Sequence, residues 1–97
     1  MENTTRIGKG EPFNLVDEIA YGIGSVVSKT LLKKDSGNIT LFSFDKGQGL
    51  SEHTAPFDAV VQILDGKAEI TIGGEPRIVS AGQMVIMPAN VPHALQA

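Results

Sequence analysis

Short runs of β-branched and apolar residues, separated by turns, dominate this 97-residue chain. Valine, isoleucine, threonine and phenylalanine gather in the runs, as is typical of strands, while glycine, asparagine or aspartate stands between them. The runs predicted to form strands are residues 25–33, 39–44, 59–64, 67–72, 77–79 and 82–87. Residues 35–38, DSGN, form a turn between the first two runs, which predicts a hairpin. Short strands with turns at a spacing of about 8–12 residues indicate a β-sandwich or barrel rather than a helical or βαβ fold.

One segment before the strands has a helical pattern. Asn14 precedes the sequence Leu-Val-Asp-Glu, so its side chain is expected to cap a helix that starts there. The acidic residues in the first turn favour that helix through its dipole. Tyr21 and Gly22 end the pattern, which predicts a short helix over residues 14–20.

Two strand runs carry apolar residues on both of their faces. Residues 59–64 are AVVQIL, and residues 82–87 are also mostly apolar, whereas residues 67–72 alternate between apolar and polar. A continuous apolar run is typical of a strand that is covered on both sides. A barrel this small has only one interior, so we expect a second subunit to cover the outer face, as a homodimer.

Composition limits the partners and the location. Eleven acidic and eight basic residues give a net charge of -3, and the basic residues do not cluster beyond Lys33-Lys34, which argues against nucleic acid as a partner. The absence of cysteine excludes disulfides and thiolate metal sites. No apolar stretch approaches the roughly 20 residues of a membrane span. We therefore expect a cytoplasmic protein with no membrane contact, folded as one domain over residues 1–97.

A motif in the middle of the chain resembles the first motif of the cupin family. It occupies residues 47–66, GQGLSEHTAPFDAVVQILDG, where Gly47, His53 and Gly66 match the family pattern in register. Ala55 stands where that pattern has a second histidine, and Ala59 stands where it has a glutamate. The chain therefore has the frame of a cupin metal site with half of the ligands replaced.

The end of the chain resembles the second cupin motif. Gly82, Pro88 and His93 match it, while Asn90 replaces a glycine and Ala97 replaces an asparagine. Together the two motifs imply an all-β fold, a small antiparallel jelly-roll barrel preceded by the short N-terminal helix. Cupins usually continue into another strand after the second motif, so that edge is expected to be open or filled by something else.

The resemblance also implies a pocket. In the family the ligands of both motifs face the barrel interior, so His53 and His93 are expected to meet there. Side chains two apart share a face of a strand, although Pro56 interrupts the alternation after His53. Phe57 and Met87 are more typical of core residues than of ligand contacts. The expected pocket residues are His53, Ala55, Phe57, Ala59, Val61, Met87 and His93.

Two imidazoles make a weak metal site. A complete cupin set has three histidines and a carboxylate, and metal affinity depends on the number of ligands. By the alternation of side chains along the strand, Asp58 is expected to face outward. It becomes the third metal ligand only if Pro56 shifts this alternation by one residue. We therefore expect no tightly bound cofactor. The ion that the resemblance implies is Fe, Mn, Ni, Cu or Zn, held by His53 and His93.

Three classes of function remain. A small-molecule binding or sensing protein fits the lost ligands best, because an apolar pocket with a few polar groups is typical of such sites. The first alternative is a metal-dependent cupin enzyme, an oxygenase or isomerase acting on a small organic acid or sugar derivative. The second alternative is a structural dimerisation module.

Overall fold

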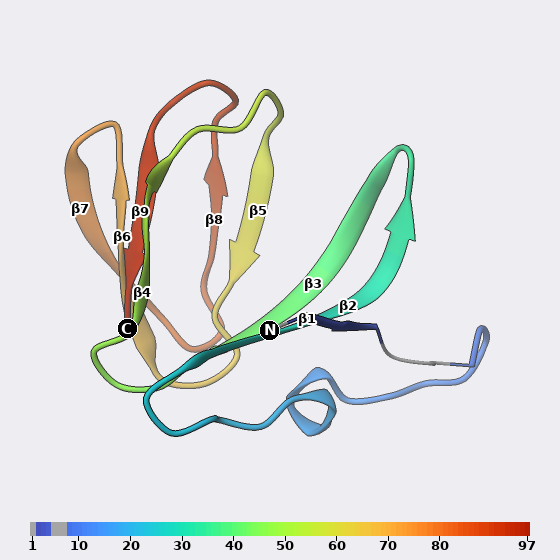
Figure 1. The fold of residues 1–97 in the computed structure, drawn as a ribbon. Coiled ribbons are helices and arrows are strands. Elements are labelled where there is room, and N and C mark those ends of the chain that lie inside the picture. The colour runs from blue at the N-terminus through green and yellow to red at the C-terminus, as the bar shows by residue number, and fades with distance from the viewer. Residues whose placement is uncertain (1, 5–7) are drawn as a thin grey trace. The chain divides into compact units, whose positions relative to one another are not determined.

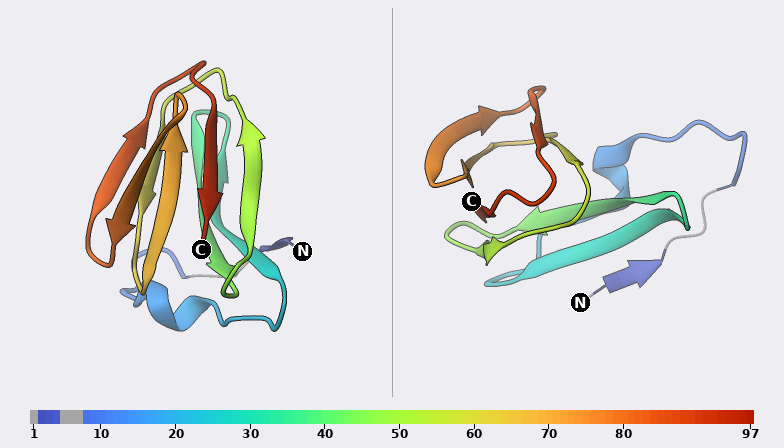
Figure 2. Two further views of the ribbon diagram at one scale, coloured as in Figure 1. Left: turned by 90° about the vertical axis from the view of Figure 1, so that its left-hand side faces the viewer. Right: turned by 90° about the horizontal axis from the view of Figure 1, so that it is seen from above.

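The computed structural model describes residues 2–4 and 8–97 and consists mainly of β-strands (Figure 1; Figure 2 gives two further views). The chain divides into two compact units, Met1–Lys46 and Gly47–Ala97. A single domain over residues 1–97 stays a prediction. No helix in the described part of the chain has the length and apolar character needed to cross a membrane.

The first unit holds β1 (Glu2–Thr4), the 3₁₀ helix η1 (Leu15–Glu18), β2 (Val26–Lys34) and β3 (Gly37–Phe44). The three strands form one sheet in the order β1-β2-β3. β2 and β3 pair antiparallel through a tight turn, which confirms the predicted hairpin. β1 pairs with β2 in parallel. The register of the hairpin shifts between Thr30 and Leu32, where a bulge adds one residue to β2.

The predicted helix over residues 14–20 is wrong in length and type. Only Leu15–Glu18 is helical, as a 3₁₀ turn, and the side chain of Asn14 makes no capping hydrogen bond. So short a segment cannot offset the cost of starting an α-helix. Tertiary contacts hold it instead. Lys29 Nζ donates to the Glu18 carbonyl at 2.8 Å and lies 3.5 Å from its carboxylate, while Ser43 Oγ donates to the Ala20 carbonyl at 2.9 Å.

The second unit contains six strands in two groups (Figure 1). A four-stranded sheet has the order β4-β9-β6-β7, and β5 and β8 form a two-stranded ribbon. All the pairs in this unit are antiparallel. The strand bounds are β4 (Gly49–His53), β5 (Ala59–Gln62), β6 (Lys67–Ile72), β7 (Glu75–Ser80), β8 (Met84–Met87) and β9 (His93–Gln96).

The strand β9 was not predicted. It lies between β4 and β6 and pairs with both of them, so the end of the second motif, from His93 onward, forms an inner strand of the sheet. Its four residues directly follow a proline and have no marked alternation, which leaves little local signal. The pairing with two neighbours, and not strand propensity, makes this segment extended.

The core of the second unit is centred on β6. Ile70 is fully buried, with Ala68 and Val79 beside it, while Lys67 and Glu69 are exposed, so the predicted alternation of residues 67–72 is confirmed. Partly buried residues from the other strands and connections pack against this cluster. They are Val61, Ile63, Ile72, Val85, Met87 and Leu95.

The ribbon β5-β8 is covered on one face only. Val61 and Val85 are partners across the two strands and pack on the core, whereas Val60, Met84 and Ile86 are 60%, 56% and 60% exposed. Cover of this outer face by a second subunit stays a prediction. An unbroken apolar run does not distinguish a strand buried on both sides from a strand with one apolar face left outside.

The turns explain two features of the motifs. Gly47 and Gly82 have φ angles of 84° and 87°, a region that glycine adopts without the steric penalty of a side chain. Asn90, which replaces a motif glycine, has a φ of 63°. Asparagine is among the few other residues that tolerate this conformation, so the departure from the family pattern preserves the turn.

We expect Gly49→Ala to destabilise the protein. A Cβ atom at this position would overlap the carbonyl oxygen of Leu95 on the neighbouring strand, where neither backbone can yield cheaply. Overpacking of this kind costs about 1–3 kcal/mol, measured as a loss of unfolding free energy in urea. Ser51→Ala, an exposed position on the same strand, is the control and should change stability by less than about 0.5 kcal/mol. Equal stability of the two variants would contradict the close approach of β4 and β9.

Candidate functional site

The two histidines of the chain lie at facing ends of neighbouring strands. His53 is the last residue of β4, His93 is the first residue of β9, and the two are partners in the register of this antiparallel pair. The sequence separates them by forty residues, and the sheet brings their side chains into contact. His93 is buried, whereas His53 is exposed.

The imidazole rings meet edge to face. Their Nε2 atoms are 3.0 Å apart, their centroids are 4.3 Å apart, and the ring planes are inclined at 74°. A contact of 3.0 Å between two nitrogens is a hydrogen bond only if one of them carries a proton and the other does not. The tautomers of the rings therefore decide how this contact is satisfied.

Backbone carbonyls orient both rings from the other side. His53 Nδ1 lies 2.9 Å from the carbonyl oxygen of Ser51, and His93 Nδ1 lies 3.3 Å from that of Val91. A carbonyl oxygen only accepts hydrogen bonds, so each contact favours a proton on Nδ1. In a neutral ring that tautomer leaves Nε2 with a free lone pair. The two Nε2 atoms are therefore the atoms available to a ligand.

The loops next to the histidines are tied together. The segment 54–58 follows His53, and the segment 88–92 precedes His93. The Asn90 amide donates to the Ala55 carbonyl at 2.7 Å, and the Ala89 amide donates to Asp58 Oδ1 at 2.8 Å. Because these bonds join the two loops, they hold the ends of β4 and β9 together around the imidazole pair.

The other expected pocket residues fall into two groups. Ala59, Val61 and Met87 lie on the inward face of the β5-β8 ribbon and are half-buried, and Ala59 pairs directly with Met87. Ala55 is also half-buried. Phe57 is 62% exposed, because the chain bends between β4 and β5 and the strand alternation that predicted an inward side chain does not continue through residues 54–58.

The donor set at the histidine pair does not fit a tightly held metal ion. Within residues 2–4 and 8–97 no three His, Cys, Asp or Glu side chains are grouped so that they could hold an ion. Asp58, which would be a third ligand only if Pro56 shifted the strand alternation, accepts a backbone hydrogen bond from Ala89. Catalytic zinc sites use three protein ligands, and the two imidazoles fall short of that number.

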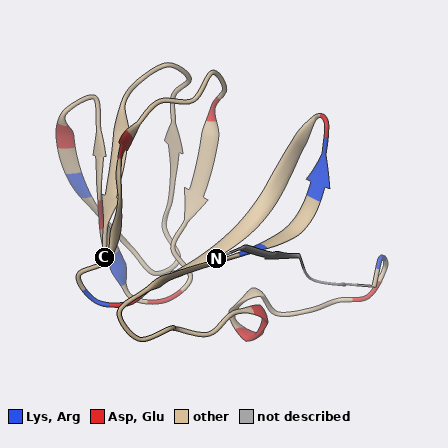
Figure 3. Cartoon of the chain, in the orientation of Figure 1, with Lys and Arg blue, Asp and Glu red and all other residues tan. Residues whose placement is uncertain are grey.

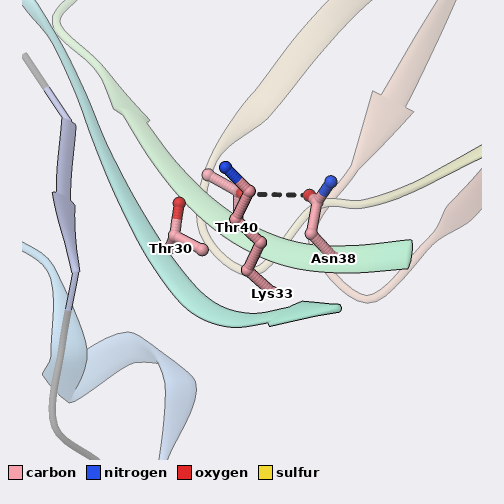
Figure 4. Close-up of a pocket in the computed structure, with 4 residues that line it drawn as sticks. All are labelled: Thr30, Lys33, Asn38 and Thr40. Carbon is pink, nitrogen blue, oxygen red and sulfur yellow. Dashed lines mark hydrogen bonds between the residues drawn. The ribbon is translucent and has the colours of Figure 1, made fainter. Parts of the chain in front are cut away.

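A separate polar depression lies on the β2-β3 hairpin (Figure 4). It is shallow and open, and its lining residues are Thr30, Lys33, Asn38 and Thr40. Thr40 Oγ1 donates to Asn38 Oδ1 at 3.2 Å. The bulge in β2 places Thr30 and Lys33 on one side of the hairpin although they are three residues apart. Sequence reasoning missed this depression, because nothing in the local pattern marks the bulge.

Known proteins resemble this chain in sequence and in structure. A cupin barrel protein from Leptotrichia buccalis is 44% identical, with a TM-score of 0.85, over 88% of this chain and 41% of that one. The SPY1581 protein of unknown function from Streptococcus pyogenes is 41% identical, with a TM-score of 0.86, over 98% of this chain and 83% of that one.

A curated relative is more distant. The uncharacterized protein SCO3923 from Streptomyces coelicolor is 32% identical over 62 residues, which cover 64% of this chain and 59% of that protein. The chain thus spans less than two thirds of the Streptomyces and Leptotrichia proteins that it matches.

The family model for the cupin domain matches residues 40–97, more than half of the chain, and includes both histidines and the glycine turns around them. Together with the all-β architecture and the similar cupin structures, this match shows that the chain belongs to the cupin family.

Proposed function

We propose that this cupin is a small-molecule binding protein whose ligand is held by the imidazole pair of His53 and His93. One observation carries the proposal. The Nε2 atoms converge at 3.0 Å, while the Nδ1 atoms are each occupied by a backbone carbonyl. The two Nε2 atoms are thus brought to one place, where a single ligand group can contact both.

The pair is not satisfied by itself when both rings are neutral and both carry their proton on Nδ1. With both Nδ1 atoms donating, two Nε2 lone pairs face each other across 3.0 Å. Such a contact becomes favourable when a proton is shared or when a ligand group donates to the nitrogens. A hydroxyl group supplies such a donor, whereas an ionised carboxylate only accepts hydrogen bonds, so a sugar derivative or a small hydroxy acid has suitable chemistry.

The alanines favour binding over metal chemistry. In the family pattern the places of Ala55 and Ala59 hold a histidine and a glutamate, and here both side chains are small and half-buried. Val61 and Met87, on the inward face of the β5-β8 ribbon and expected to line the pocket, are apolar. A few orienting polar groups among apolar residues are typical of small-molecule sites.

We expect a bound ligand to perturb both imidazole rings together. The chain has only two histidines, so the ring resonances in an NMR spectrum belong to this site alone. Addition of small organic acids, hydroxy acids or sugar phosphates at millimolar concentration should shift both sets of signals for at least one compound. The physical reason is the shared contact at Nε2, through which a change at one ring reaches the other.

His53→Gln is the matched variant for this titration, because glutamine retains polarity without the imidazole. It should weaken binding of the active compound by at least about tenfold, the effect of losing about one hydrogen bond. Asn38→Ala, in the separate depression on the hairpin, should leave binding unchanged. A compound that binds equally well to wild type and to His53→Gln would place the binding site elsewhere.

A metal-dependent enzyme is the second candidate. The orientation of both rings by backbone carbonyls favours it, because imidazoles that bind metals usually donate their other ring N–H to such a group. Fe, Mn, Ni, Cu or Zn would then be held by His53 and His93, and substrate or water would have to complete the ligand set. A structural dimerisation module is the third candidate, in which neither ring responds to any ligand.

We expect purified protein to hold well under one equivalent of metal per chain. Two imidazole ligands give too low an affinity to survive dialysis, since affinity rises with the number of protein ligands. Elemental analysis of protein prepared without added metal or chelator measures this directly. A full equivalent of Fe, Mn or Zn that remains after dialysis at pH 7 would favour the metal-dependent enzyme over the small-molecule binding protein.

The double variant Ala55→His plus Ala59→Glu should create a strong metal site. If these alanines occupy the family ligand positions, the new side chains complete a set of three histidines and a carboxylate with His53 and His93. Calorimetric titration with Ni²⁺ or Zn²⁺ should then show affinity at least about a hundredfold above wild type, because preplaced ligands bind more tightly.

The matched control places the same side chains on exposed neighbouring positions, as Thr54→His plus Gln62→Glu. This control should gain little affinity. A folded Ala55→His, Ala59→Glu protein with no advantage over the control would refute the alignment of both alanines with the ligand positions.

A further inference from the structure

The polar depression on the β2-β3 hairpin is built from two pairs of residues that face each other across the strands. Thr30 pairs with Thr40, and Lys33 pairs with Asn38. Figure 4 shows all four side chains on one side of the hairpin. The cavity volume is about 90 Å³. Since a water molecule takes about 30 Å³ in the liquid, the depression holds about three waters or a group of similar size.

One hydroxyl in the depression is buried and lacks a protein partner. Thr30 is only 5% exposed, and its Oγ1 makes no hydrogen bond with the residues that the structure describes. No completely inaccessible side-chain oxygen of those residues is left without a partner, so this oxygen is reached from the depression that it lines. A hydroxyl that loses most of its water without gaining a partner is unfavourable. Valine, of almost the same shape, would avoid this cost.

Three hydrogen-bond donors converge on the depression. Thr40 Oγ1 donates to Asn38 Oδ1 at 3.2 Å, which orients the amide and leaves its NH₂ group free to donate. The ammonium of Lys33 forms no ion pair within the described part of the chain. The third donor is the Thr30 hydroxyl. No carboxylate is among the lining residues, so the set combines donors with one positive charge.

The bulge in β2 creates this set. Across the hairpin, Thr30 pairs with Thr40, but the next residue of β3, Ile39, pairs with Leu32. In a regular strand Leu32 would share a face with Thr30, because side chains two apart point the same way. The extra residue puts Lys33 in that place instead. Bulges are common beside functional sites, where they redirect a side chain in this manner.

We propose that the depression binds a small oxyanion, the carboxylate or phosphate group of a ligand, through the Thr30 hydroxyl, the Lys33 ammonium and the Asn38 amide. Oxyanions only accept hydrogen bonds and form their strongest ones with charged donors, so they match this set. The site lies wholly within the first unit. It is independent of the ligand proposed for the histidines.

The local charge favours an anion although the whole chain is acidic. The net charge is -3, and Lys33-Lys34 is the single pair of adjacent basic residues in the sequence. Figure 3 shows this basic end of β2 beside an acidic residue of the turn, Asp35. Asp35 does not line the depression. Two positive charges against one negative charge attract an anion to this end of the hairpin.

The first test is a titration of ¹⁵N-labelled protein with phosphate and, separately, with acetate. The amide signals of residues 30–40 should shift and saturate for at least one of them, with a dissociation constant of about 1–10 mM for so small a ligand. Sodium chloride of equal ionic strength should give no saturable shift. Saturation with phosphate alone assigns the site to a phosphate group, and saturation with acetate alone assigns it to a carboxylate.

The two adjacent lysines provide a matched pair of variants. Lys33→Gln should weaken anion binding by at least about tenfold, because it removes the charged donor that lines the depression. Lys34→Gln removes the same charge from a neighbouring residue outside the lining, and it should weaken binding by less than about threefold, since salt screens exposed charges.

Thr30→Val separates binding from a structural role of the hydroxyl. It should weaken anion binding by at least about tenfold, the effect of losing about one hydrogen bond. Without anion, the melting temperature should equal or exceed that of wild type, because the variant removes a buried polar group that has no protein partner. A structural role predicts the opposite pattern, a lower melting temperature with unchanged anion binding.

Three results would overturn the proposal. The first is the absence of saturable shifts in residues 30–40 with both anions. The second is an equal loss of binding in Lys33→Gln and Lys34→Gln, which would indicate a general charge effect. The third is unchanged binding in Thr30→Val. Each result leaves the histidine proposal intact, because that proposal is tested by the ring signals of His53 and His93.

Discussion

The pairing of β9 with strands on both of its sides is the constraint on which the second unit depends. Its partnership with β6 aligns Leu95 with Ile70 at the buried centre of the sheet, and its partnership with β4 aligns His93 with His53. Gly49 allows the close approach of the two backbones on the β4 side. A four-residue strand thus joins the hydrophobic core to the imidazole pair, so the stability of the sheet and the geometry of the site depend on the same hydrogen-bonded register.

The proposed site keeps two imidazoles, and a backbone carbonyl orients each of them. Alanine stands at the two other ligand positions of the family pattern, so the proposed site has fewer donors than a tightly bound ion needs. Asp58 shows how a nearby carboxylate can have a structural role, because it accepts the Ala89 amide and joins the loops around the pair. Orientation without a full ligand set favours reversible binding of a polar group over permanent metal binding.

The second unit also divides its surface by charge. Exposed acidic and basic residues mark β6 and β7, whereas the outer face of β5 and β8 is uncharged and apolar. The inner face of the same ribbon carries Val61, Val85 and Met87 against the core. One pair of strands therefore contributes one set of side chains to the core and leaves the other set exposed.

The sequence by itself determined the all-β class, the β2-β3 hairpin and the alternation of Ala68 and Ile70, because these follow from turn chemistry and from a period of two along a single strand. The resemblance to the family motifs predicted that His53 and His93 meet, as their side chains do. Only the tertiary structure decided that residues 93–96 form an inner strand, that Phe57 is exposed, that residues 15–18 form a 3₁₀ turn, and that the Nε2 atoms meet at 3.0 Å. These features depend on register and contacts between segments far apart in the chain, and local propensity carries no information about such distances.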